Sequence, residues 1–225
     1  DKWIKESKNA DALQMIAKKV TTASKNRQKA REQKELARKR NEISSASLPV
    51  KLIDCELAGS EHAELYIAEG DSAVSALKGA RDGERNALLG IRGKIINAHK
   101  STPKLVLANA EVQDIIKALG AGSGADFDID KMRYPGGIFI ATDADPDGNA
   151  IATLLYALFW HLFRDVLLQG KFYKLETPLF VVSTKEGSKS RKLYARNERE
   201  RDKHIRGLEK TGTKYSTTRL KGLGE

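Results

Sequence analysis

The chain has 225 residues, enough for one substantial domain with appendages, and its single cysteine, Cys55, excludes an intrachain disulfide and a cysteine-rich zinc site. Its net charge of +10 favours a polyanionic partner such as nucleic acid, because lysine and arginine side chains that neutralise phosphates release bound counterions. No apolar run approaches the roughly 20 residues of a membrane helix, and the N-terminus does not read as a signal peptide. We therefore expect a soluble protein of the reducing cytoplasm without membrane contact.

The first part of the chain predicts a long helix, from Asp11 to about Arg40. Leu13, Ile16, Ala17 and Val20 fall on one face at helical spacing, and lysine and arginine residues accumulate beyond them. This basic part is a solvated helix or a helix that contacts DNA, and the pattern does not choose between the two. The serine-rich stretch 44–49 is typical of a linker, so a domain boundary is expected near residue 48.

Three aspartates stand at alternate positions directly after the apolar run 138–141. Asp143, Asp145 and Asp147 are followed by Gly148, and carboxylates packed this closely repel one another unless a cation lies among them. The same spacing begins an EF-hand calcium loop, but the twelfth place, which needs a bidentate glutamate, is Leu154. An acidic turn between a strand and a helix remains, in the crevice where α/β sheets bind ligands. Ligation by oxygen alone suits Mg²⁺ or Mn²⁺.

A further carboxylate is predicted at a second strand end. Residues 64–68 read as a strand, followed by Glu69, Gly70 and a helix. Gly70 permits the tight turn, and Asp71 or Ser72 can cap the helix. Capping does not explain Glu69, which we expect to be a metal ligand or an acid–base group at the same sheet edge as the aspartates.

The remaining segments alternate between strand and helix, which predicts a mostly parallel sheet with right-handed crossovers. Arg92, Gly93 and Lys94 follow one strand end and can approach a phosphate, although this signal is weak by itself. Trp160 and His161 lie in the most apolar helix and are expected to pack. The expected elements are strands 87–91, 138–141, 171–175 and 179–182, helices 109–119 and 151–166, and a short surface helix 196–208 in a polar, charged stretch that begins at Lys185.

Four motifs, taken together and in this order, closely resemble the B subunit of bacterial type IIA DNA topoisomerases, the family of DNA gyrase and topoisomerase IV. They are residues 69–73, 92–94, 143–148 and 221–225. The resemblance runs from about Leu48 to Glu225. It implies an α/β Toprim fold with a mostly parallel sheet flanked by helices in residues 48–184. Residues 1–47 would be the end of a long transducer helix with a linker, and 185–225 the start of a C-terminal tail segment.

The resemblance also implies roles for named residues. Glu69, Asp143, Asp145 and Asp147 would hold Mg²⁺, or Mn²⁺ in its place, at the scissile phosphate of double-stranded DNA. Glu69, as general acid–base, would act in catalysis with Asp143, Asp145 and Lys94. Arg92, Gly93, Lys94 and Lys221 would contact the DNA.

The same resemblance implies partners outside this chain. A tyrosine of an A subunit would be the nucleophile, the enzyme would be an A2B2 heterotetramer, and ATP would bind to a domain absent from this chain. Two alternatives use the same residues. One is a Toprim nuclease or primase, with water or a nucleotide as nucleophile; the other is a DNA-binding module that has lost catalysis.

Overall fold

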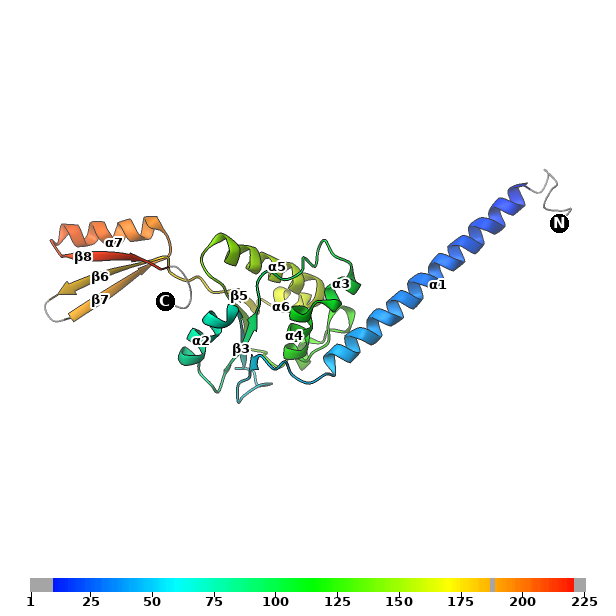
Figure 1. Ribbon diagram of the computed structural model, residues 1–225, viewed down its shortest axis with the longest axis horizontal. Helices are drawn as coiled ribbons and strands as arrows, with labels where there is room; N and C mark the ends of the chain where they lie inside the picture. Colours follow the sequence, from blue (N-terminus) through cyan, green and yellow to red (C-terminus); the bar gives the residue numbers. More distant parts are fainter. Residues whose placement is uncertain (1–9, 187–188, 221–225) are drawn as a thin grey trace.

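The computed structural model describes residues 10–186 and 189–220. Figure 1 shows three parts in chain order: the long helix α1 (Ala10–Ser44), a central α/β body, and a small antiparallel sheet with one helix. Within the described residues, no helix combines the length and the apolar character needed to cross a membrane.

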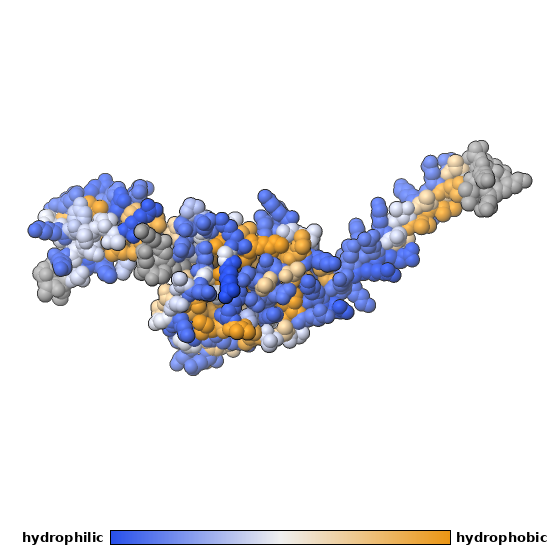
Figure 2. Space-filling view, viewed as in Figure 1, coloured by the Kyte–Doolittle hydropathy of each residue, from blue (hydrophilic) through white to orange (hydrophobic). Residues whose placement is uncertain are grey.

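Helix α1 projects from the body and is exposed over most of its length (Figure 1). It joins the core near its C-terminal end, through Leu36 and Ile43. Its outer part carries apolar surface (Figure 2), where Met15, Ile16 and Val20 are exposed. The long helix predicted from the sequence is confirmed, whereas its apolar stripe lies away from the core.

The central sheet has the strand order β1-β3-β2-β4-β5. Four of its strands run parallel, and β1 pairs antiparallel with β3 at one edge. The bounds are β1 (Leu52–Ile53), β2 (Glu64–Glu69), β3 (Asn86–Ile91), β4 (Gly137–Ala141) and β5 (Phe172–Lys174). The predicted mostly parallel sheet is confirmed. Because β2 lies between β3 and β4, the carboxyl ends of these three strands meet at one sheet edge.

Helices cover both faces of this sheet. Helices α4 (Ala110–Leu119), α5 (Pro146–Leu162) and α6 (Arg164–Leu168) contribute to the main core, into which β2 and β4 point Leu65, Ile67, Ile138 and Ile140. Helix α2 (Gly70–Ala80) packs on the other face against Ala68 and Ala141. Helix α3 (Pro103–Ala108) and the short turns η3 (Gly124–Asp126) and η4 (Ile129–Lys131) complete the body.

The single helix predicted after the acidic turn, with its apolar face between Ile151 and Val166, differs from the structure in two respects. It begins earlier, at Pro146, and it breaks at Phe163, whose backbone (φ −142°, ψ 44°) lies outside the helical region while its ring is fully buried. Trp160 was expected to pack but is 48% exposed, with the Arg164 guanidinium 4.3 Å from its ring centre.

The small sheet has the strand order β7-β6-β8 and is antiparallel throughout. Its elements are β6 (Phe180–Glu186), β7 (Lys189–Ala195), α7 (Glu198–Lys210) and β8 (Tyr215–Arg219). The boundary predicted after residue 184 falls inside β6. Strands β7 and β8 were not predicted, because polar residues alternate there with few apolar ones.

A polar network fixes the segment before β2 to the loop before β4. The Asp54 carboxylate pairs with the Arg133 guanidinium and accepts a hydrogen bond of 2.8 Å from the Tyr134 hydroxyl. It also accepts one of 2.9 Å from the backbone nitrogen of Cys55. Tyr134 is fully buried, and burial, followed by the bond to Asp54, raises the pKa of its hydroxyl. The network therefore holds together the segments that enter two neighbouring strands.

Replacing Asp54 with alanine is expected to lower the free energy of unfolding by about 2–4 kcal/mol, because the buried Tyr134 hydroxyl and the Arg133 guanidinium lose their partner. Tyr134→Phe should cost less, about 1 kcal/mol, because Asp54 keeps its ion pair with Arg133. Urea denaturation of the full-length protein measures both values. Equal losses in the two variants would contradict a central role for the carboxylate.

Candidate metal centre

Glu69 ends strand β2 and lies at the N-cap of α2, where its side chain makes no capping hydrogen bond. Gly70 follows with φ +79°, a left-handed conformation that strongly favours glycine. The prediction that Asp71 or Ser72 caps this helix is wrong, because the helix begins at Gly70, before either residue. Glu69 Oε2 is buried without a hydrogen-bond partner in the described part of the chain. This oxygen is therefore available to a cation.

The acidic turn connects the end of β4 to the start of α5. Asp145 is the N-cap of α5, and its Oδ1 accepts a hydrogen bond of 2.7 Å from the backbone nitrogen of Gly148. A Cβ at Gly148 would lie 2.1 Å from the backbone oxygen of Asp143, so any larger residue would push the two backbone segments apart. The motif needs glycine here for close approach, although Gly148 lies inside a helix.

The electrostatics place the carboxylates of both strand ends near one another. The pKa of Glu69 is raised, first by burial and then by the negative charges of Asp143, Asp145 and Asp147. The Lys94 ammonium opposes this rise. Four carboxyl groups thus share one corner of the sheet with one lysine.

Lys94 comes from the end of the third strand, β3. Its Nζ lies 2.6 Å from Asp147 Oδ1, and this hydrogen bond raises the pKa of Lys94, with smaller contributions from Glu69 and Asp145. Gly93 before it has φ +64°, and Arg92 and Lys94 are exposed. Lys221, also predicted to contact DNA, lies outside the described residues. In this structure a lysine is the cation among the acids.

The donor set suits a hard divalent ion, because all the candidate ligands are carboxylates. The buried Glu69 oxygen without a partner also fits such an ion. Among the described residues, however, no three His, Cys, Asp or Glu side chains converge on one point that could hold a metal. Two of the expected ligands are engaged elsewhere, Asp145 as the helix cap and Asp147 with Lys94. An ion that used the same oxygen of Asp147 would compete with Lys94.

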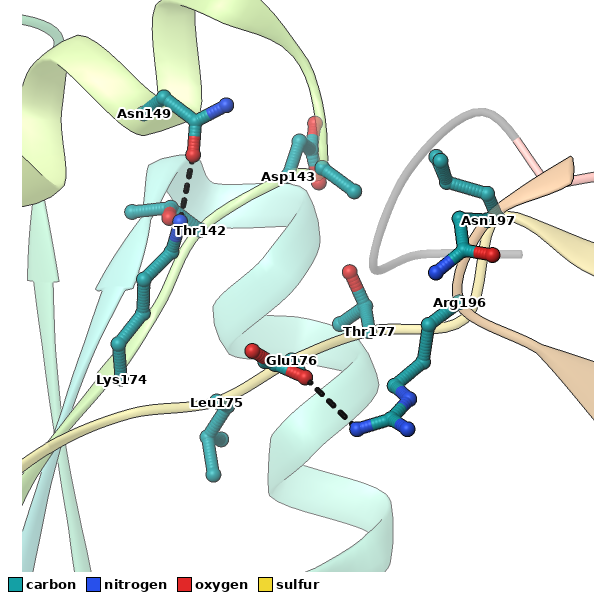
Figure 3. Close-up of a pocket in the computed structure, with 11 residues that line it drawn as sticks. Thr142, Asp143, Asn149, Lys174, Leu175, Glu176, Thr177, Arg196 and Asn197 are labelled. Atoms are coloured by element: carbon teal, nitrogen blue, oxygen red, sulfur yellow. Dashed lines mark hydrogen bonds and ion pairs between the residues drawn. The ribbon is translucent and has the colours of Figure 1, made fainter. Parts of the chain in front are cut away.

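A cavity of about 450 Å³ opens beside Asp143, between the sheet edge and the small sheet (Figure 3). On one side Lys174 Nζ donates to Asn149 Oδ1, and on the other Arg196 pairs with Glu176 at 3.2 Å. Neither Lys174 nor Arg196 was predicted from the sequence. Lys174 ends strand β5, so the strand-end reasoning that found Glu69 would have found it too.

Comparisons with known proteins identify the family of this chain. The family model for the Toprim domain matches residues 64–176, half of the chain, from the start of β2 to just beyond β5. The chain is 40% identical over 217 residues to the B subunit of DNA gyrase from Thermotoga maritima and 38% identical to that from Staphylococcus aureus. Each alignment covers 96% of this chain and 33% of the relative, so the chain spans about a third of the length of these proteins.

The predicted resemblance to the B subunits of type IIA topoisomerases is therefore confirmed. The matched segment contains Glu69, Lys94 and the three aspartates of the acidic turn. The chain belongs to the Toprim domain family.

Proposed function

We propose that this chain is the metal-binding half of the DNA cleavage and religation site of a type IIA topoisomerase. The observation that carries the proposal is the corner described above, where strand ends β2 and β4 supply four carboxyl groups and β3 supplies Lys94. The similarity to the B subunits of DNA gyrase along nearly the whole chain supports it.

Glu69, Asp143, Asp145 and Asp147 would hold Mg²⁺, with Mn²⁺ as a substitute. The bound ion would polarise the scissile phosphate and stabilise the departing 3′ oxygen. Glu69, as general acid–base, would give a proton to that oxygen and take it back on religation. Burial, and then the charges of the three aspartates, raise the pKa of Glu69 among the residues of this chain. Lys94, with Arg92 and Gly93, would lie along the DNA backbone at the same strand edge, and Lys221 would add a further contact.

The nucleophile would come from another chain. By analogy with the gyrase relatives, we infer that a tyrosine of an A subunit attacks the phosphate, within an A2B2 assembly in the cytoplasm. ATP would bind and be hydrolysed in a part of the protein outside this chain. The whole reaction would change DNA topology through a transient double-strand break.

The first test uses the full-length protein reconstituted with its A subunit. The variants Glu69→Gln and Asp143→Asn should each reduce Mg²⁺-dependent cleavage by at least about 100-fold, because each change removes a charged ligand. Gel assays of covalent DNA complexes measure this, and filter binding should show DNA affinity within about threefold of wild type. Glu61→Gln is the matched control: Glu61 is 86% exposed and precedes β2, at the opposite end of that strand from Glu69. Full cleavage by the Glu69 variant would refute the assignment.

Replacing Lys94 with methionine should have opposite effects on metal binding and cleavage. Without the ammonium, the acidic corner is less neutralised and Asp147 is released, so Mn²⁺ should bind several-fold more tightly in the absence of DNA. Cleavage should fall, because the lysine no longer faces the phosphate. Electron paramagnetic resonance of free Mn²⁺ reports the first effect. Lys78→Met, in the last turn of α2, is the control; unchanged Mn²⁺ affinity in the Lys94 variant would contradict the competition.

The source of the nucleophile distinguishes the proposed topoisomerase function from the alternative of a Toprim nuclease or primase. The full-length chain without an A subunit should neither cut nor relax supercoiled DNA in Mg²⁺. With the A subunit, it should give breaks with protein attached to the 5′ ends. Cleavage by the chain alone would favour the nuclease, and binding without cleavage after reconstitution would favour the inactive module.

A further inference from the structure

The small sheet has one face that α7 covers and one that it leaves open. In antiparallel strands, directly paired residues point to the same side and successive residues to opposite sides. The Arg201 guanidinium of α7 lies 4.7 Å from the ring centre of Phe180, and the Tyr215 hydroxyl donates to Glu209 of α7. Phe180 and Tyr215 therefore mark the covered side. Figure 1 shows α7 running along the small sheet.

The register assigns eight residues to the opposite side, which we name the open sheet face. Val181 pairs with Tyr194 and Thr218, Ser183 with Lys192 and Ser216, and Lys185 with Ser190. The open sheet face comprises Val181, Ser183, Lys185, Ser190, Lys192, Tyr194, Ser216 and Thr218.

The composition of this face is one-sided. Among these eight residues there are two lysines, four serine or threonine hydroxyls and a tyrosine, but no aspartate or glutamate. Lys185, Ser190, Lys192, Ser216 and Thr218 are exposed, and Tyr194 is 57% exposed. By contrast, α7 on the other side carries acidic residues beside its basic ones, including Glu198, Glu200, Asp202 and Glu209. The two sides of the small module therefore differ in their acids: the side of α7 mixes acidic with basic residues, whereas the charged residues of the open sheet face are all basic.

A hollow of about 500 Å³ adjoins the open sheet face at the end that carries Lys185, and its lining includes Ser183, Ser190 and Ser216 together with Lys214. Lysine ammonium and hydroxyl groups are the donors that bind phosphate oxygens without reading base sequence. An acid-free row of such donors has the wrong charge for a basic partner and too few apolar side chains for an obligate protein interface.

From these observations we propose that the open sheet face binds the DNA backbone, as an extension of the surface that holds DNA at the metal centre. The inference rests on the proposed function, because it takes duplex DNA as the substrate. Arg196, at the end of β7, lines the cavity beside Asp143, so the sheet starts close to the metal centre. Strand β6 then spans roughly 20 Å, which corresponds to about six base pairs of duplex.

The test compares two double variants of the full-length protein. Lys185→Met with Lys192→Met removes the two charges of the open sheet face. The matched control, Lys203→Met with Lys210→Met, removes two exposed charges from α7 in the same module. Affinity for a linear duplex is measured from about 50 to 200 mM salt.

The first variant should reduce the magnitude of the salt slope by about 1.8, since each lost phosphate contact contributes about 0.9. Its hydroxyl-radical footprint should shorten by about six base pairs on one side of the cleavage site. The control variant should change neither measurement. Unfolding midpoints within about 2 °C of wild type would show that both variants remain folded.

Equal slopes and footprints for the two double variants would overturn the inference. Unchanged DNA binding with weakened association of the A subunit would also overturn it, because the face would then bind protein. Failure of the wild-type protein to bind duplex DNA would instead refute the proposed function itself. If Glu69→Gln loses cleavage while the two double variants have equal salt slopes, the assignment of the metal centre is retained. Only the proposed DNA contact of the open sheet face is then refuted.

Discussion

The candidate metal centre depends on one close approach between two pieces of backbone. Gly148 in the first turn of α5 lies against Asp143, where a Cβ would come within 2.1 Å of the backbone oxygen. This contact folds the acidic turn back onto the helix that follows it, and the bond from Gly148 nitrogen to Asp145 closes it. The backbone at Asp143 and the side chain of Asp145 are therefore held by local geometry, which lowers the entropic cost of assembling a site from neighbouring like charges.

Parallel topology supplies the rest of the corner. Strands β3, β2 and β4 are adjacent, so a lysine, a glutamate and an acidic turn that lie far apart in the sequence arrive at one edge. Their charges then interact: Glu69 is pushed toward its protonated form, while Lys94 neutralises Asp147. The Lys94 ammonium offsets part of the negative charge of this arrangement. A phosphate would draw Lys94 away from the acids, which gives a physical reason why the proposed metal and DNA sites would be coupled.

The parts of this corner that follow from strand ends could be predicted from the sequence, whereas the choice of side-chain partners could not. An apolar run followed by a carboxylate identified Glu69 and the aspartates, because parallel strands bring their carboxyl ends to one edge. The pairing of Lys94 with Asp147 could not be predicted, since it depends on the distance between the loop after β3 and the first turn of α5. Strands β7 and β8 were missed for a different reason: they cross a small module whose open face is polar, so the period-two pattern is weak. The exposure of Trp160 was not predicted either, because the apolar stripe of α5 is wider than the surface available to bury it.

The linker between the body and the small sheet relates the two charged regions. Arg196 at the end of β7 pairs with Glu176 in that linker and with Glu200 in α7, at 3.2 Å and 2.6 Å. One guanidinium thus ties the small module to the segment that leaves β5, although each contact is exposed and contributes little stability by itself. Arg196 offsets the charge of both acids, and Lys174, which also lines the cavity beside Asp143, donates to the uncharged Asn149. A phosphate backbone that left the proposed metal centre would therefore meet Lys174 first and the lysines of the open sheet face beyond it, past two carboxylates, Glu176 and Glu200, that are paired with Arg196.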